Sequence, residues 1–128
     1  MIYLDTSVAL AHLLGEDVAP PAALWDNVVV SSRLLEYELW TRVNARGLAK
    51  SHHAAVRALL DRVAMAELSP LVLARALEPF PTGVRTLDAL HLATADFLRA
   101  QGQAVQLATY DQRMRTAGAQ LGLSIATI

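Results

Sequence analysis

Short apolar runs alternate with segments of helical spacing along this chain. Buried strands are predicted where the runs are apolar or β-branched, at Ile2–Leu4, Val28–Val30, Ala66–Leu68, Ala104–Ala108 and Leu123–Ala126. Helices are predicted between them by period-3.6 spacing and by polar or glycine residues at their ends, at 8–14, 20–25, about 33–46, 51–64, 70–77, 87–100 and 111–122. Strand and helix therefore follow one another repeatedly.

The strands are apolar on both faces rather than alternating, which is typical of a parallel sheet covered by helices. We therefore expect an α/β fold in one domain over residues 1–128, with a mostly parallel sheet of four to five short strands and helices on both faces. One face of the helix at 51–64 presents Ala55, Leu59, Leu60 and Val63 to the core.

Acidic residues stand where strands pass into helices. Asp5 and Asp111 follow predicted strands, and Asp88 opens the helix at 87–100, which Thr86 is expected to cap. Because ligands bind at the carboxyl ends of parallel strands, we expect Asp5 and Asp111 to share one rim that Asp88 can reach. Carboxylates gathered in this way form hard oxygen ligands for Mg²⁺ or Mn²⁺.

Each acid also has a structural interpretation. Asp5 and Asp111 are suitable helix caps, and Asp88 suits the positive end of a helix dipole. In the helix that follows Ser31–Ser32, Glu38 is spaced to pair with Arg42. Glu36 and Glu38 flank its apolar stripe on opposite sides, so periodicity alone does not choose between them.

The composition excludes several other kinds of site. The chain has 128 residues, a formal net charge of −1 and no cysteine. Zinc thiolate sites, disulfides and a thiol nucleophile are thereby excluded, and a broad non-specific grip on nucleic acid is disfavoured. We expect no signal peptide and no membrane span, and therefore a cytoplasmic protein. Of the histidines, His91 is expected to be a packed or hydrogen-bonded core residue rather than a ligand.

Four phrases carry a family resemblance: Tyr3-Leu4-Asp5-Thr6-Ser7, Glu38-Leu39, Thr86-Leu87-Asp88-Ala89-Leu90-His91-Leu92-Ala93-Thr94-Ala95 and Ala108-Thr109-Tyr110-Asp111. Together they resemble the PIN-domain nucleases, and most of all the VapC toxins of type II toxin–antitoxin pairs. The resemblance covers nearly the whole chain. It implies a Mg²⁺- or Mn²⁺-dependent endoribonuclease that cleaves tRNA, rRNA or mRNA, forms a homodimer and is neutralised by a cognate VapB-type antitoxin.

The resemblance also implies roles for particular residues. The catalytic acids would be Asp5, Glu38, Asp88 and Asp111, with Asp5, Asp88 and Asp111 on the metal and Thr6, Ser7 and Thr109 supporting them. Glu38 is favoured over Glu36 because the family places its second acid before a Leu and six residues after a Ser, here Ser32.

The spacing from Asp88 to Asp111 is longer than in many relatives, which leaves Asp96 as a rival for the fourth acid. Asp96 lies two helical turns beyond Asp88, about 12 Å at 1.5 Å per residue, too far for both to touch one ion. We therefore prefer Asp111.

Arginines near the acids are candidates for binding RNA phosphates, and Arg85, Arg113 and Arg115 are the best placed by sequence. The aromatic residues Trp25, Tyr37 and Trp40 suit either a partner surface or the core, with at least one Trp expected in the core.

Other functions fit less well. A receiver domain needs an early acidic pair and a late Lys, and a phosphatase with an aspartate nucleophile needs a second Asp where Ser7 stands. A housekeeping RNA-processing nuclease and a non-catalytic PIN-like binding module remain as alternatives.

Overall fold

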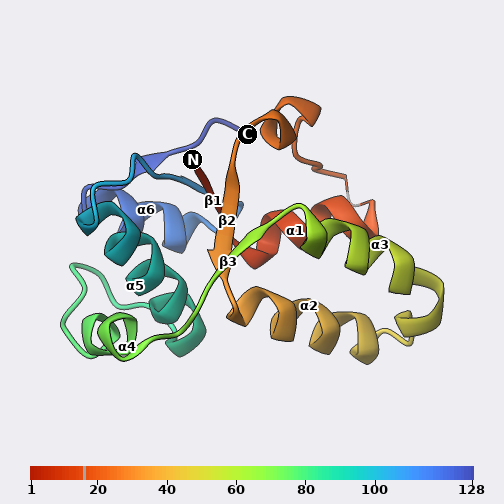
Figure 1. The fold of residues 1–128 in the computed structure, drawn as a ribbon, viewed down its shortest axis with the longest axis horizontal. Helices are drawn as coiled ribbons and strands as arrows, with labels where there is room; N and C mark the ends of the chain where they lie inside the picture. The colour runs from red at the N-terminus through yellow and green to blue at the C-terminus, as the bar shows by residue number, and fades with distance from the viewer. Residues whose placement is uncertain (16) are drawn as a thin grey trace.

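The computed structural model describes residues 1–15 and 17–128, and its centre is a parallel sheet of five strands in the order β3-β2-β1-β4-β5 (Figure 1). The strands are β1 (Ile2–Leu4), β2 (Val29–Ser32), β3 (Ala64–Ala66), β4 (Gln106–Ala108) and β5 (Ser124–Ile125). The predicted α/β class and parallel sheet are confirmed.

Helices cover both faces of this sheet. They are α1 (Thr6–Leu14), α2 (Leu34–Ala45), α3 (Ala49–Asp61), α4 (Pro70–Ala76), α5 (Thr86–Ala100) and α6 (Gln112–Gln120), with a 3₁₀ turn, η1, at Ala22–Asp26. In Figure 1, α1, α2 and α3 lie on one side of the strands, and α4, α5 and α6 lie on the other. No helix in the described ranges combines the length and the apolar character that crossing a membrane requires.

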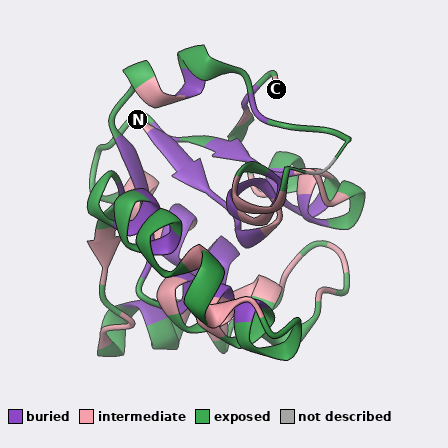
Figure 2. Ribbon diagram, turned by 90° about the vertical axis from the view of Figure 1, so that its right-hand side faces the viewer, coloured by how far each residue is buried: buried purple, intermediate pink, exposed green. Residues whose placement is uncertain are grey.

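Two apolar clusters fill the space between the sheet and its helices. Ile2 and Leu4 point to the side of α1, α2 and α3, whereas Tyr3 points to the side of α5 and α6. This alternation within β1 follows from the two-residue period of a strand. The central strands β1 and β2 are buried along their whole length, whereas the edge strands β3 and β5 are partly exposed (Figure 2).

Several predicted boundaries were wrong. Val28 is 66% exposed and lies before β2, which continues instead through the fully buried Ser31 and Ser32. These serines tolerate burial because Ser31 donates to the carbonyl of Leu4 and Ser32 accepts from the amide of Leu34. Polar residues inside a buried strand are invisible to an apolar pattern.

The third strand and its neighbours were also misplaced. The strand predicted at Ala66–Leu68 lies earlier, at Ala64–Ala66, because α3 ends at Asp61 rather than at Ala64. The buried residues of α3 are Val56, Leu59 and Leu60, so the prediction was wrong for Ala55, which is exposed. The register against β2, in which Val30 opposes Ala64, fixes this strand, and local sequence does not reveal such pairing.

The predicted first residues of α5 and β4 differ only slightly from those observed. The helix α5 begins at Thr86 itself, and no side chain caps it. The strand predicted at Ala104–Ala108 starts at Gln106. The aromatic residues divide as follows: Trp25 and Trp40 pack against the core, and Tyr37 is 63% exposed.

A leucine pair tests the core. Leu39 of α2 is fully buried, so Leu39→Ala is expected to lower the free energy of unfolding by about 2–5 kcal/mol through lost burial and a cavity. Leu77 is 89% exposed, and Leu77→Ala is expected to change the free energy of unfolding by less than about 0.5 kcal/mol. Denaturant unfolding of both variants measures the difference, and equal losses would contradict the packing described here.

Candidate active site

The pairing of β1 with β4 creates the centre of the site. Leu4 lies opposite Ala108 in the parallel register, and the amide of Asp5 donates to the carbonyl of Ala108 at 3.0 Å. The next residue of each strand, Asp5 and Thr109, therefore emerges at the same edge. The Thr109 hydroxyl donates to Oδ2 of Asp5 at 2.8 Å.

Asp5 is held by short polar side chains. Its Oδ2 also accepts from the Ser7 hydroxyl at 2.7 Å and from the Ser7 amide at 3.4 Å, which makes Asp5 the N-cap of α1. Ser7 in turn accepts from the amide of Tyr110 at 3.0 Å. All three of these hydrogen bonds to Asp5 are accepted by Oδ2, so Oδ1 is available to bind a ligand.

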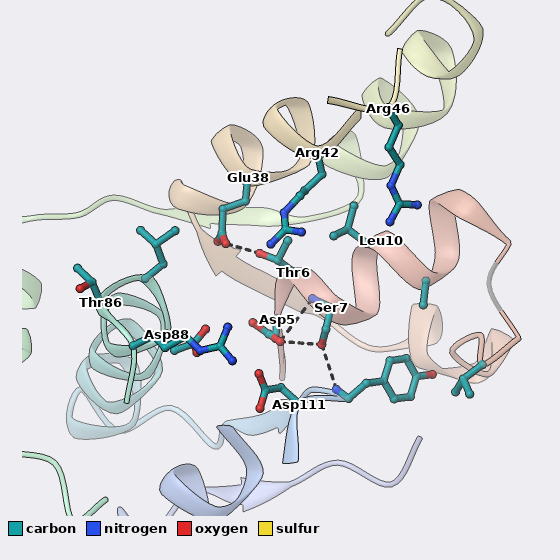
Figure 3. A pocket seen from close by; sticks show the side chains of 15 residues that line it. Asp5, Thr6, Ser7, Leu10, Glu38, Arg42, Arg46, Thr86, Asp88 and Asp111 are labelled. Carbon is teal, nitrogen blue, oxygen red and sulfur yellow. Dashed lines mark hydrogen bonds between the residues drawn. The ribbon is translucent and has the colours of Figure 1, made fainter. Parts of the chain in front are cut away.

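Asp111 follows β4 and caps α6, as the sequence predicted. Its Oδ1 accepts from the amides of Arg113 at 2.8 Å and Met114 at 3.2 Å. Asp88 lies in the first turn of α5. Figure 3 shows Asp5, Asp88 and Asp111 turned toward one another from three elements.

Glu38 reaches the same pocket from α2. Its Oε1 accepts from the Thr6 hydroxyl at 2.9 Å (Figure 3). The same oxygen lies 2.6 Å from Nε2 of His91. Glu36 lines a separate hollow with Tyr37 and Trp40. The structure therefore separates the two glutamates that periodicity left equivalent, and it brings Glu38 to the other acids.

A cavity of about 860 Å³ holds these acids together with three arginines. Its charged lining residues are Asp5, Glu38, Asp88, Asp111, Arg42, Arg46 and Arg85. Of the arginines named from sequence, Arg85 lines the cavity, whereas Arg113 and Arg115 lie outside its lining.

Sequence reasoning missed Arg42 and Arg46. Both extend from α2 toward the cavity (Figure 3). Positions 38, 42 and 46 recur at a spacing of four, which places them along one side of a helix. That spacing from Glu38 was the signal that could have found them.

Asp96 has a different role from the four acids. It pairs with Nε of Arg75 at 2.7 Å and with the guanidinium of Arg99, and it does not line the cavity. The pair with Arg75 joins α4 to α5, whereas the pair with Arg99 lies within α5. His91 is fully buried and hydrogen-bonded, as expected from the sequence.

Asp88 is affected both by its partial burial and by the neighbouring carboxylates. Burial raises the pKa of Asp88 above its ordinary value of 3.8, and the nearby charges of Asp5 and Asp111 raise it further, while His91 and Arg85 oppose the shift. The unligated acids therefore repel one another.

The donor set suits a hard divalent cation, which would offset this repulsion. Asp5 and Asp111 each have one oxygen bound and one left over, and Asp88 faces both. Within residues 1–15 and 17–128, however, no three acidic, histidine or cysteine side chains are already arranged to hold a metal ion. The carboxylate oxygens are thus the right type of ligand for such a cation, but they are not already arranged in a coordination geometry.

Comparisons with known proteins agree with this geometry. The family model described as the PIN domain matches residues 2–119. The chain is 33% identical to ribonuclease VapC35 of Mycobacterium tuberculosis, over 98% of this chain and 95% of that protein. It is 36% identical to ribonuclease VapC46 of the same organism, over 97% of this chain and 95% of that protein.

Two solved structures share the fold. A toxin–antitoxin complex from Klebsiella pneumoniae matches with a TM-score of 0.68 and 15% identity, over 99% of this chain and 97% of that chain. VapC20 of Mycobacterium tuberculosis, a sarcin–ricin loop cleaving toxin, matches with a TM-score of 0.70 and 23% identity, over 92% and 95%. At these identities the likeness concerns the fold alone.

The repulsion at Asp88 predicts a pH-dependent stability. Because its folded-state pKa is raised, the unfavourable contribution of ionised Asp88 is fully present above that pKa and is lost as the pH falls toward 3.8. In metal-free buffer at neutral pH, Asp88→Asn is expected to raise the Tm, and the gain should shrink as the pH falls.

Thermal unfolding over a pH series measures this effect. Asp26→Asn, which neutralises an exposed carboxylate outside the cavity, is the control and should show no such pattern. A lower Tm for Asp88→Asn at neutral pH would contradict the repulsion.

Proposed function

Because the chain belongs to the PIN domain family, we propose that it is a divalent-metal-dependent endoribonuclease, acting as the VapC-type toxin of a toxin–antitoxin pair. The observation that carries this proposal is the cavity in which Asp5, Glu38, Asp88 and Asp111 meet. Similarity over nearly the full chain to two proteins named ribonucleases supports it.

The acids divide the work between them in this proposal. Asp5, Asp88 and Asp111 would hold Mg²⁺ or Mn²⁺, which supplies charge neutralisation at the scissile phosphodiester when bound. Glu38 and the second oxygen of Asp5 accept hydrogen bonds from water and so orient it for attack in line with the leaving oxygen. Thr6, Ser7 and Thr109 support this arrangement by holding the other oxygen of each carboxylate.

RNA phosphates would contact the arginines that line the cavity. Arg42 and Arg46 from α2 and Arg85 before α5 line it together with the acids. Guanidinium groups bind phosphate oxygens in a bidentate manner. We therefore add Arg42 and Arg46 to the proposed RNA-binding residues, with Arg113 and Arg115 on α6 as an extension outside the cavity.

The proposed partners are a cognate VapB-type antitoxin and a second copy of the chain, and the proposed compartment is the cytoplasm. Support for an antitoxin comes from a structural neighbour that is itself a toxin–antitoxin complex. The competing function is housekeeping RNA processing by the same chemistry. Arrest of growth on expression, relieved by the product of an adjacent small gene, would separate the two.

The first test of the proposal is metal-dependent cleavage. Asp5→Asn and Asp88→Asn are each expected to reduce cleavage of pooled tRNA and rRNA by more than about 100-fold, the upper range for loss of a residue that only supports a metal site. Activity should require Mg²⁺ or Mn²⁺ and disappear with EDTA.

Circular dichroism should show that both variants remain folded, and Asp26→Asn should cut as the unmodified protein does. Full activity in either site variant would remove that residue from the mechanism. Cleavage that persists in EDTA would remove the metal.

The two glutamates of α2 provide a matched pair. Both lie on one helix two positions apart, yet Glu38 lines the acidic cavity and Glu36 lines the neighbouring hollow. Glu38→Gln is expected to abolish cleavage, and Glu36→Gln to preserve it. The same cleavage assay measures both, and the reverse result would mean that the wrong glutamate has been assigned.

A further inference from the structure

A chain of hydrogen bonds runs from the sheet to Glu38 through buried side chains. The amide of Ser32, at the end of β2, donates to the hydroxyl of Tyr3 at 3.2 Å. That hydroxyl lies 2.8 Å from Nδ1 of His91, and Nε2 of the same ring lies 2.6 Å from Oε1 of Glu38. Tyr3 and His91 are fully buried and do not line the cavity.

The partners of Tyr3 assign the direction of its hydrogen bond. A backbone amide only donates, so the tyrosine oxygen accepts from Ser32 and its own hydrogen is available for Nδ1. A tyrosine hydroxyl carries its hydrogen at neutral pH, so it can donate as well as accept. This arrangement places the Tyr3 hydroxyl to donate to Nδ1 of His91, which as the acceptor would carry no hydrogen.

The other side of the ring agrees with this assignment. With Nδ1 unprotonated, the ring hydrogen lies on Nε2 and points at the Glu38 carboxylate. Thr6 donates to Oε1 of Glu38 at 2.9 Å, and its oxygen lies 3.3 Å from Nε2, where it accepts as well. The opposite tautomer would set a nitrogen lone pair against a carboxylate oxygen at 2.6 Å.

We propose that His91, fixed by Tyr3 as the tautomer with its hydrogen on Nε2, is a positioning residue that holds Oε1 of Glu38 and turns Oε2 toward the substrate. This role rests on the proposed function, since Glu38 acts there on water. His91 itself touches neither substrate nor cation.

Glu38 needs a positioning residue because the glutamate side chain is long and flexible. Glu38 reaches the cavity through three torsions and loses more rotamer freedom than an aspartate when it is fixed. Asp5 is held at Oδ2 by two hydroxyls, and Glu38 is held at Oε1 by one hydroxyl and one imidazole. In both carboxylates the second oxygen is left for chemistry.

The assignment is tested first by ¹⁵N NMR of the imidazole nitrogens in the full chain. The His91 signals, identified by their loss in His91→Gln, are expected to show a protonated Nε2 and an unprotonated Nδ1. In Tyr3→Phe the donor to Nδ1 is gone, and the signals should shift toward a mixture of tautomers. Protonation of Nδ1 in the unmodified protein, alone or together with Nε2, would overturn the proposal.

The positioning role is tested by two amide substitutions in the RNA cleavage assay. Glutamine places its amide nitrogen close to the position of Nε2 and can still donate to Glu38, whereas asparagine ends near Nδ1 and cannot. His91→Asn is expected to lower kcat by about 10–100-fold with little change in KM. His91→Gln should lose much less.

The outcomes separate this inference from the proposed function. Equal losses in the two variants, both folded by circular dichroism, would mean that His91 only fills space, and the inference would fail while the nuclease stands. If the unmodified protein cuts no RNA, the proposed function fails, and the NMR result still decides whether His91 donates to Glu38.

Discussion

The parallel pairing of β1 with β4 is the contact on which the site depends. Because Leu4 stands opposite Ala108, the residues that follow both strands emerge together, and Thr109 reaches Asp5 directly. A shift of this register by one residue would turn each side chain to the other face of the sheet. The neighbouring pair, β1 with β2, then sets the start of α2 and so the approach of Glu38.

Bringing several carboxylates together costs free energy through like-charge repulsion. Helix dipoles and hydroxyl hydrogen bonds offset part of this cost. Asp5 and Asp111 cap α1 and α6, and Asp88 lies in the first turn of α5, so three helix N-termini face the same acids. The positive ends of these helices stabilise negative charge. The helix dipoles do not remove all of the repulsion, because the pKa of Asp88 remains raised. A bound cation would relieve the repulsion that remains.

Much of this arrangement could be predicted from the sequence, because apolar runs mark strands and acids directly after strands mark a rim. The choice between Glu36 and Glu38 could not be made from periodicity, since it depends on which side of α2 faces α1 and α5. Arg42 and Arg46 follow Glu38 at a spacing of four, so the sequence could have indicated them once Glu38 was chosen. The extent of β2 was hidden because Ser31 and Ser32 are polar, and the Ser31 hydroxyl is satisfied by the distant carbonyl of Leu4. The choice of glutamate and the burial of Ser31 thus depend on tertiary contacts that local pattern does not contain.

The order of the strands also governs when the site can exist during synthesis. β1 is the first strand to be synthesised, yet it lies at the centre of the sheet. The hydrogen bond between Asp5 and Thr109 cannot form until Thr109, 104 positions later, has been synthesised. Contacts this distant in sequence form late in folding. A ribosome that has made the first strand, α1 and α2 carries Asp5 and Glu38 without Asp88 or Asp111. The four acids meet only after Asp111 has emerged, so a partly made chain beside ribosomal and messenger RNA does not carry the complete acidic centre.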